Sequence, residues 1–546
     1  MRTDTRLKVR RVLRSASWPA QPMHAAGGIV MNQPDDPAAP IPAADPAVTP
    51  APQAPESPSD RVPALAWVIG AVFVAVELAV SGRYGFQQDE LYFIVAGHHL
   101  GFGYVDQPPL VPLLTRITDI LGVSPTAIRV IPALAGGAVV VAAAKFAALF
   151  GAGRFGRVLA ALAAACAPIV IGATHIGNTT PLDLLAWAAV LLCVTTALLR
   201  HRPRWWLGAG AAAGAGLENN NLMLLLLAGL AIGVLVSQQR SVLRTRWPWA
   251  GAGIAAAIWA PNIIWQATHG WPQLAMASAL HQQNISLADY LGGLPAQLVY
   301  PGLLLAALLI AGFIRLWRTP ELRSLAVTCT LIVLYVLAWV PGKTYYSDGM
   351  APVVLAAGSV AAERWIARAR RPRLRRAIVV AAPLVGVAIA LPAVLPILPA
   401  ADVHDLPASS QRSDVGDTVG WPQLTHAVAA EDAALVRAGQ PPTSIFTGYY
   451  AEAGALDVLG SADHLPPVLS GHNAFWMWGP GQASDHTVLA VDALGQLRPY
   501  FASCRLLTTY YAPYHVHNDW TDLRIGVCTG PSASWRTLWP HLKHYG

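Results

Sequence analysis

Three carboxylates and two histidines lie within one short segment that follows the first membrane-length apolar run. They are Asp89, Glu90, His98, His99 and Asp106, between Gly82 and Leu110. A charged side chain is costly inside a bilayer, so charges at the mouth of a membrane helix face water or a binding site. A carboxylate placed there can take a proton from a hydroxyl group, which is general base chemistry. The alternative is that Asp89, Glu90 and Asp106 cap the helices that begin beside them.

The elements that must position these residues are predicted to be membrane helices. The 546 residues are 54% hydrophobic and 12% charged, about half the charge of a soluble domain. Apolar runs of roughly 18–22 residues recur along the chain. They predict an all-α polytopic membrane domain with eleven spans, at about 63–82, 129–150, 157–176, 180–199, 204–217, 220–237, 248–267, 294–316, 323–341, 348–366 and 377–398.

The loops between these runs differ in charge, and this difference predicts the topology. Alternate loops carry clustered arginines, most densely between 364 and 376, whereas the opposite loops carry only Arg83, Arg116, Arg129 and Lys343. Because positive loops stay in the cytoplasm, the N-terminus is predicted to be inside and residues after about 399 outside a plasma membrane. The net charge of +7 therefore reflects orientation in a lipid bilayer and does not indicate a nucleic-acid partner.

The composition predicts three regions. Residues 1–62 are rich in Pro, Ala and Asp, and we expect a disordered cytoplasmic tail in which Met31 is an alternative start to Met1. Residues 63–400 form the membrane domain, and residues 401–546 form a small extracytoplasmic α/β domain.

Apolar runs alternate with helix-like segments in the last region. Strands are predicted at 443–448, 486–492 and 523–528, and a helix at 494–503. Cys504 and Cys528 lie here and would form a disulfide in an oxidising compartment, although their spacing alone leaves this open.

With this topology, five separate segments place polar residues on the outer face. Besides the first loop, they are the turns with His175, Asn178 and Asp183, with Glu218, Asn219, Asn220 and Asn221, with His269, and with Lys343, Tyr345, Tyr346 and Asp348. Their common side predicts an outward-facing site. Lys343 is one of only four lysines, and at this surface it can hold a phosphate by point charge or snorkel to the interface.

The other polar residues also have two interpretations. Asp183 lies just inside an apolar run, where a carboxylate needs a partner. His175 and His269 are candidate metal ligands, or they are packing histidines. Asn219 and Asn220 are additional site candidates, or they cap a short turn.

Four of these segments carry a resemblance to a known family. They are DELYFIVAGHHLGFGYVDQPPLVPLL, HIGNTTPLDLLAW, PNIIWQATHGWP and GKTYYSDGMAPVVLAAG. Together they resemble the glycosyltransferase family 39-like membrane proteins of the GT-C superfold, over residues 63–400. The resemblance implies an enzyme that moves a sugar from a polyprenyl-phosphate donor to an acceptor on the outer face. The acceptor would be an envelope glycan, a lipid or a protein.

The family motifs assign roles to positions of this chain. Asp89 matches the general base and Glu90 its neighbour in acceptor or metal handling. Asp106 and Asp183 match further acidic positions, and Asp106 is also expected near the donor phosphate. The turn of Gly342, Lys343, Tyr345 and Tyr346 would suit that phosphate. One departure is the turn at 218–221, which lacks the lysine that related sequences carry.

The implied chemistry is a one-step displacement that inverts the anomeric centre. The phosphate leaving group needs positive charge, from Lys343 and a divalent ion held by Asp106 and His269. No nucleotide-binding motif is present in the sequence, so no nucleotide cofactor is expected. In the outer domain, His472, Asn473, Trp476 and Trp478 are candidates for acceptor binding, or parts of a structural lid.

Two other functions remain open at this stage. A flippase or transporter of lipid-linked saccharides would place polar groups near the bilayer midplane and often shows an inverted repeat. The sequence has no visible repeat, and its carboxylates gather at one surface. A non-catalytic envelope assembly protein could keep the fold and lose donor binding, which the altered turn at 218–221 would permit.

Overall fold

The computed structural model describes residues 60–281, 287–299, 301–340, 343–406, 415–480, 486–516, 518 and 520–545. Residues 58–546 form one compact unit, so the predicted domain boundary at 400 stays a prediction. Most of the predicted tail, with Met1 and Met31, lies outside the described residues. Its last residues are packed, since Asp60 accepts hydrogen bonds of 2.8 and 2.6 Å from Arg200.

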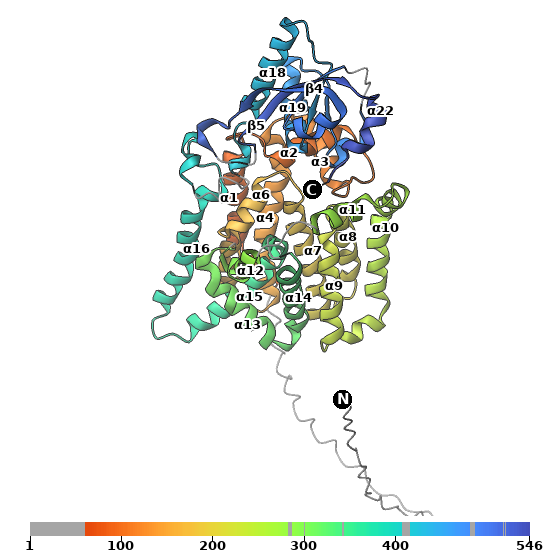
Figure 1. The fold of residues 1–546 in the computed structure, drawn as a ribbon. Coiled ribbons are helices and arrows are strands. Elements are labelled where there is room, and N and C mark those ends of the chain that lie inside the picture. The colour runs from red at the N-terminus through yellow and green to blue at the C-terminus, as the bar shows by residue number, and fades with distance from the viewer. Residues whose placement is uncertain are drawn as a thin grey trace, which may run out of the picture. The chain divides into compact units, whose positions relative to one another are not determined.

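Every predicted apolar run is a helix or a bent pair of helices (Figure 1). The helices of the bundle are α1 (Ala64–Val80), α4 (Pro125–Leu149), α5 (Arg154–Ala165), α6 (Pro168–His175), α7 (Thr180–Leu199), α8 (Trp205–Leu217), α9 (Leu222–Val236), α10 (Arg246–Thr268), α12 (Leu287–Val299), α13 (Ala306–Arg318), α14 (Arg323–Trp339), α15 (Ala351–Ala367) and α16 (Pro372–Val394). Three shorter helices lie between them, α2 (Gln88–His98), α3 (Leu110–Thr118) and α11 (Pro272–His281). α4 contacts α1, α5, α7 and α15 and forms the centre of the apolar core.

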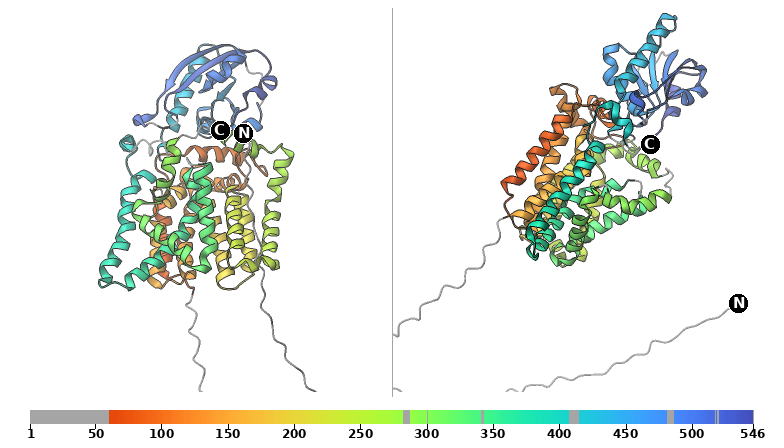
Figure 2. Two further views of the ribbon diagram at one scale, coloured as in Figure 1. Left: turned by 60° about the horizontal axis from the view of Figure 1, so that its bottom comes forward. Right: turned by 90° about the vertical axis from the view of Figure 1, so that its left-hand side faces the viewer.

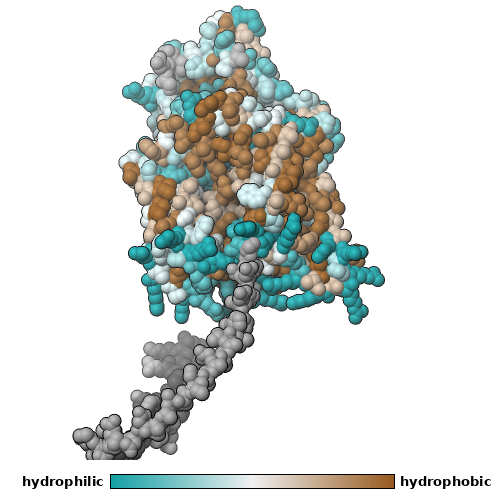
Figure 3. Space-filling model, turned by 180° about the vertical axis from the view of Figure 1, so that it is seen from behind, coloured by the Kyte–Doolittle hydropathy of each residue, from teal (hydrophilic) through white to brown (hydrophobic). Residues whose placement is uncertain are grey.

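The chain is a multi-pass membrane protein, but the count of eleven spans is not confirmed. Within the described residues, five helices are long and apolar enough to cross a membrane, or seven if each bent pair is one span. α1, α8 and α9 have 17, 13 and 15 residues and fall short of 18. Figure 3 shows an apolar band with a strongly polar end below it. The direction in which the chain crosses the membrane stays a prediction.

A five-stranded mixed sheet forms the centre of the C-terminal region, in the order β2-β1-β3-β5-β4. Its strands are β1 (Ser444–Thr447), β2 (Val468–Ser470), β3 (Thr487–Val491), β4 (Phe501–Tyr510) and β5 (Leu523–Pro531). The helices around it are α18 (Trp421–Arg437), α19 (Tyr450–Leu459), α20 (Asn473–Met477), α21 (Leu494–Leu497) and α22 (Trp535–Leu538). β1 pairs in parallel with β2 and β3, whereas β5 is antiparallel to β3 and β4.

The three predicted strands are confirmed, but the predicted helix at 494–503 is wrong beyond Leu497. The α-helical part ends at Leu497, and a single 3-10 turn follows at Arg498–Tyr500. From Phe501 the chain forms β4, which pairs with β5 over its whole length. The long-range pairing decides the conformation here, and local propensity did not reveal it.

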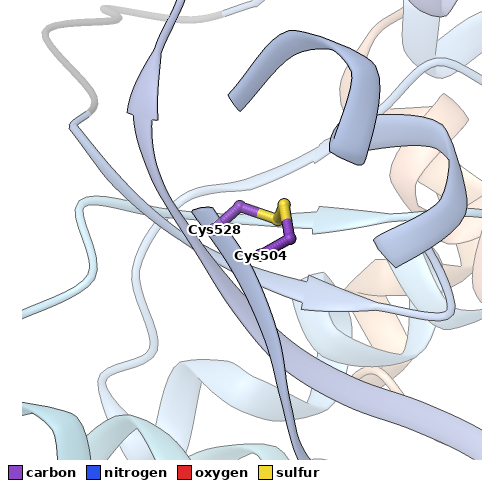
Figure 4. The surroundings of a disulfide bond; sticks show 2 residues. All are labelled: Cys504 and Cys528. Atoms are coloured by element: carbon purple, nitrogen blue, oxygen red, sulfur yellow. A yellow bond between two sulfur atoms is a disulfide. The ribbon is translucent and has the colours of Figure 1, made fainter. Parts of the chain in front are cut away.

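Cys504 and Cys528 form a disulfide between β4 and β5, at positions directly opposite in the ladder (Figure 4). The disulfide fits an oxidising compartment. The other three cysteines are free, and Cys166 and Cys329 are buried.

We expect the double variant Cys504→Ala/Cys528→Ala to lower the stability of the C-terminal α/β region. The two residues are 24 positions apart, and closing a loop of this length is worth about 3 kcal/mol. Thermal unfolding followed by near-UV circular dichroism would measure the shift. Cys193→Ala, which removes a free cysteine, is the control, and equal melting temperatures for all three proteins would contradict the prediction.

The α/β region and the membrane region meet through α19 and α2 (Figures 1 and 2). Gly454 of α19 lies so close to α2 that a Cβ atom there would be 3.1 Å from the backbone of Leu91 and of Tyr92. Tyr92 and Phe93 of α2 pack with Ala453, Ala474 and other apolar residues of the α/β region. This close contact brings side chains of the α/β region onto the first turn of α2, where Asp89 lies.

Candidate functional site

The start of α2 is fixed by a reciprocal cap. The Gln87 side chain accepts a hydrogen bond of 2.7 Å from the backbone N–H of Asp89, and the Glu90 carboxylate accepts one of 2.8 Å from the backbone N–H of Gln87. The capping role predicted for the acidic pair therefore exists, and Glu90 performs it. The carboxylate of Asp89 takes no part in this cap.

Glu90 is fully buried and fully hydrogen-bonded. Arg129, 1% exposed, donates to both of its oxygens at 2.8 and 2.7 Å. The backbone N–H groups of Gln87 and Gly177 supply two more donors. Since each carboxylate oxygen already accepts two hydrogen bonds, we revise the predicted role of Glu90 in acceptor or metal handling. Its ion pair holds α2 against the first turn of α4 and so positions Asp89.

Asp89 has no cationic partner among the described residues. Its Oδ1 accepts a hydrogen bond of 2.8 Å from the Tyr450 hydroxyl of α19, and its Oδ2 accepts a long one of 3.5 Å from Asn178. The side chain is only partly exposed. Burial raises the pKa of Asp89, the bonds from Tyr450 and Asn178 oppose this, and the charge of Glu90 adds to it. A carboxylate of raised pKa without a neutralising cation is suited to accept a proton.

Asp106 lies near Asp89, on the loop between α2 and α3. It accepts a hydrogen bond of 2.8 Å from the Tyr92 hydroxyl. Burial raises the pKa of Asp106 to about 6, the Tyr92 bond opposes this, and the charge of Asp89 adds to the rise. The structure thus brings together two of the predicted carboxylates, each bound by a tyrosine hydroxyl.

The loop that carries Asp106 is attached to α10. Asn262 and Gln266 are buried on this helix and donate to the carbonyls of Phe102 and Tyr104, at 3.0 and 3.2 Å. Gly103 packs so tightly that a Cβ atom would lie 2.5 Å from the Trp265 ring. These contacts fix the backbone on which Asp106 is placed.

A second polar group lies around the start of α7. Asp183 accepts a hydrogen bond of 2.8 Å from Asn219, which also donates to the carbonyl of Thr179, while Asn220 donates to the Thr179 hydroxyl at 3.3 Å. Asp183 therefore has the partner that a carboxylate in a membrane helix needs, and Asn219 and Asn220 supply the turn that positions it.

The predicted phosphate turn lies beside this group, because η5 (Thr344–Met350) packs on α7. Its Tyr345 and Tyr346 rings meet edge to face, and the Lys343 ammonium lies 5.9 Å from the Tyr346 ring centroid. Lys343 forms no ion pair with a carboxylate in the described part of the chain. Partial burial lowers its pKa. Gly342 lies outside the described residues.

The structure does not bring the predicted metal ligands together. His269 is exposed at the end of α10, where it stacks on Trp265 at 4.2 Å and contacts that residue's carbonyl. His175 is buried and pairs at 2.8 Å with Glu77 of α1. No group of three or more His, Cys, Asp or Glu among the described residues could hold a metal ion. The divalent ion therefore stays a prediction that the donor set does not support.

The candidate acceptor residues of the C-terminal α/β region are mostly packed. His472 is 1% and Asn473 3% exposed, and the indole N–H groups of Trp476 and Trp539 bond to each other's carbonyls. Trp478 differs, because it stacks on His99 of α2 at 4.4 Å. The lid interpretation fits His472, Asn473 and Trp476, and Trp478 alone of the four contacts the membrane region by a stacked ring. His98 pairs with Asp119 at the surface.

Sequence reasoning missed four residues around the site. Tyr92 and Tyr450 supply hydroxyls to the two carboxylates, Arg129 neutralises Glu90, and Glu77 pairs with His175. Glu77 carried a usable signal, since it is a carboxylate inside an apolar run. Nothing in the sequence marks Tyr450 as a neighbour of Asp89, 361 positions away.

Comparison with known proteins supports one family. The family model of dolichyl-phosphate-mannose-protein mannosyltransferases matches residues 106–265, a range that contains Asp106, Asp183 and the turn at 218–221. The structure is similar to the crystal structure of ArnT from Cupriavidus metallidurans bound to undecaprenyl phosphate, with 15% sequence identity and a TM-score of 0.56. The match covers 85% of this chain and 98% of the ArnT chain. The resemblance to glycosyltransferase family 39-like proteins is confirmed.

The fold is therefore like that of ArnT, a bundle of helices with a small α/β region near the C-terminus. The apo structure of the same ArnT matches over the same shares of the two chains, with a TM-score of 0.53. No curated protein matches the sequence. At 15% identity the similarity shows the fold alone, so the chemistry has to be inferred from the residues of this chain.

Proposed function

We propose that this protein transfers a sugar from a polyprenyl-phosphate donor to an acceptor on the outer face of the membrane. The observation that carries the proposal is Asp89, which the fold holds at the end of the bundle and which has no cationic partner in the part of the chain that the structure describes. The family 39-like fold supports a transferase, and the undecaprenyl phosphate bound to ArnT supports the class of donor.

The proposed reaction is a single displacement. Asp89 takes the proton of the acceptor hydroxyl as its oxygen forms a bond to the anomeric carbon. The bond between that carbon and the phosphate oxygen breaks, and the phosphate leaves with the electron pair. Lys343 stabilises the negative charge that develops there. Attack opposite the leaving group inverts the anomeric centre, and no step requires a metal ion.

Transfer can be tested with the purified full-length protein in vesicles. Radiolabelled polyprenyl-phosphate sugars would be supplied with envelope extracts as acceptors, and the labelled product would be separated from the lipid. Labelled product supports the proposal. Movement of the labelled lipid between leaflets without product would indicate a flippase, and neither result would indicate an assembly protein, so both outcomes reject the transferase.

Tyr450→Phe is expected to shift the pH profile of transfer to higher pH. The Tyr450 hydroxyl lowers the pKa of Asp89, so its loss raises that pKa. Because the base must be deprotonated, activity rises with pH through this pKa, and the rising limb moves to more alkaline values. The measurement is initial rate against pH. Tyr511→Phe, at an exposed tyrosine of the same region, is the control, and an unshifted limb in Tyr450→Phe would contradict the role of Tyr450.

Lys343→Met is expected to raise the KM for the donor at least tenfold, because a phosphate loses its point charge. Lys343→Arg keeps the charge and should recover most of the affinity. Donor titrations of both variants would measure this. Equal KM values for Lys343→Met and the natural protein would assign Lys343 to membrane anchoring.

A further inference from the structure

A cavity of about 990 Å³ opens between α1, α4 and α7, away from Asp89. Most of the residues that line it are apolar. They are Val62, Trp67, Ala138, Val141, Ala142, Leu185, Ala188, Ala189 and Leu192. The cavity is open at its side, because Trp67 is 59% exposed and Ala138 is exposed. Its volume is at the upper end of the range of small-molecule sites, about 300–1,000 Å³.

The polar residues of the cavity give it a positive charge. They are Asp60, Arg61, Lys145 and Arg202. Asp60 is already neutralised by two hydrogen bonds from Arg200. Lys145 donates once, to the carbonyl of Asp60 at 2.8 Å. Within the described residues, the side chains of Arg61, Lys145 and Arg202 form no ion pair with a carboxylate.

The position of these cations in the fold places the cavity far from the proposed sugar-transfer site. Lys145 follows Arg129 by 16 residues on the same helix, which is roughly 24 Å along an α-helix. Arg202 lies in the turn between α7 and α8, and Arg157 of α5 bonds to the carbonyl of Arg61. The cations therefore belong to the arginine-rich end of the bundle, and the apolar walls extend from them along the membrane helices.

We infer that this cavity binds an anionic phospholipid from the leaflet at the arginine-rich end. The phosphate would lie against Lys145, Arg61 and Arg202, and an acyl chain would lie along the alanine-lined wall of α4 and α7. Charge complementarity argues for this ligand, since cationic pockets between membrane helices recognise anionic head groups. A zwitterionic lipid would leave the excess positive charge without compensation. The inference does not depend on the proposed function.

The test measures lipid binding by the full-length protein in detergent, with native mass spectrometry. Phosphatidylglycerol and phosphatidylcholine of equal chain length are the two probes. We expect phosphatidylglycerol to bind at least tenfold more tightly. Lys145→Gln/Arg202→Gln should reduce that binding about tenfold or more, because each cation near a head group contributes on the order of a tenfold change or slightly less.

Two further variants make the result decisive. Arg240→Gln/Arg318→Gln removes two cations from the same end outside the cavity and should leave binding unchanged. Ala138→Phe fills the open side without changing charge and should also weaken binding. Equal affinity for the two lipids would overturn the inference, because the cations of the cavity would then not select the head group. Equal loss in the cavity and control variants would also overturn it and indicate general electrostatic attraction.

Discussion

Asp89→Asn is expected to lower the rate of sugar transfer by about 10²–10⁴, the usual contribution of a positioned general base. The amide has the same shape, can still accept from Tyr450 and keeps the backbone cap of α2 intact. It cannot take the proton of an acceptor hydroxyl. Initial rates at saturating donor, with the melting temperature of the same preparation, would measure the effect.

The matched control is Asp119→Asn. Asp119 lies at the end of α3 and pairs with His98 and Arg116 at the surface. We expect its rate to stay within about twofold of the natural protein, because surface pairs contribute little. A folded Asp89→Asn protein with full transfer activity would remove the base from the proposed mechanism, and Asp106 would then be the next carboxylate to test.

Arg129→Met is expected to destabilise the protein by about 3–5 kcal/mol, because it leaves Glu90 as a buried charge without compensation. Both side chains are almost completely buried. Arg129 also donates to the carbonyls of Ser81 and Gly85, at 2.6 and 2.8 Å. Its loss therefore loosens the segment between α1 and α2. Thermal unfolding in detergent, followed by intrinsic fluorescence, would show the change.

Two comparisons separate the buried charge from a general packing effect. Glu90→Gln/Arg129→Met removes both charges and should recover part of the lost stability. Arg116→Met breaks an exposed pair with Asp119 and should cost no more than about 1 kcal/mol. If the double variant is as unstable as Arg129→Met alone, the uncompensated charge is not the cause. If Arg129→Met melts like the natural protein, the ion pair does not hold α2.

The sequence predicted where the apolar helices lie, because long apolar runs are local features of a chain, but the count of eleven membrane spans is not confirmed. All eleven predicted runs are helices or bent pairs of helices, although only five to seven pass as membrane spans. Helix boundaries moved by a few residues, and Pro168 divides one predicted span into α5 and α6. The helix predicted at 494–503 was wrong for a different reason, since β4 is stabilised by pairing with β5.

The sequence identified individual residues of the candidate site but not the contacts between them. Asp89 and Asp106 were identified from their position at a membrane mouth, and the structure places them near each other. Glu90 is also a carboxylate and directly follows Asp89 in the sequence. Only the structure separates them, because Arg129 reaches across 39 positions to bind one carboxylate and not the other.

The sequence by itself determined that this chain crosses a membrane repeatedly, that several carboxylates gather in the segment after the first apolar run, and which family it resembles. These are properties of composition, periodicity and short motifs. The tertiary structure decided which carboxylate of the pair is neutralised by an arginine, which hydroxyl binds the other and where a cationic cavity forms. Such properties depend on contacts between residues far apart in the chain, as between Asp89 and Tyr450, and only the packing of α2 against α19 brings those residues together.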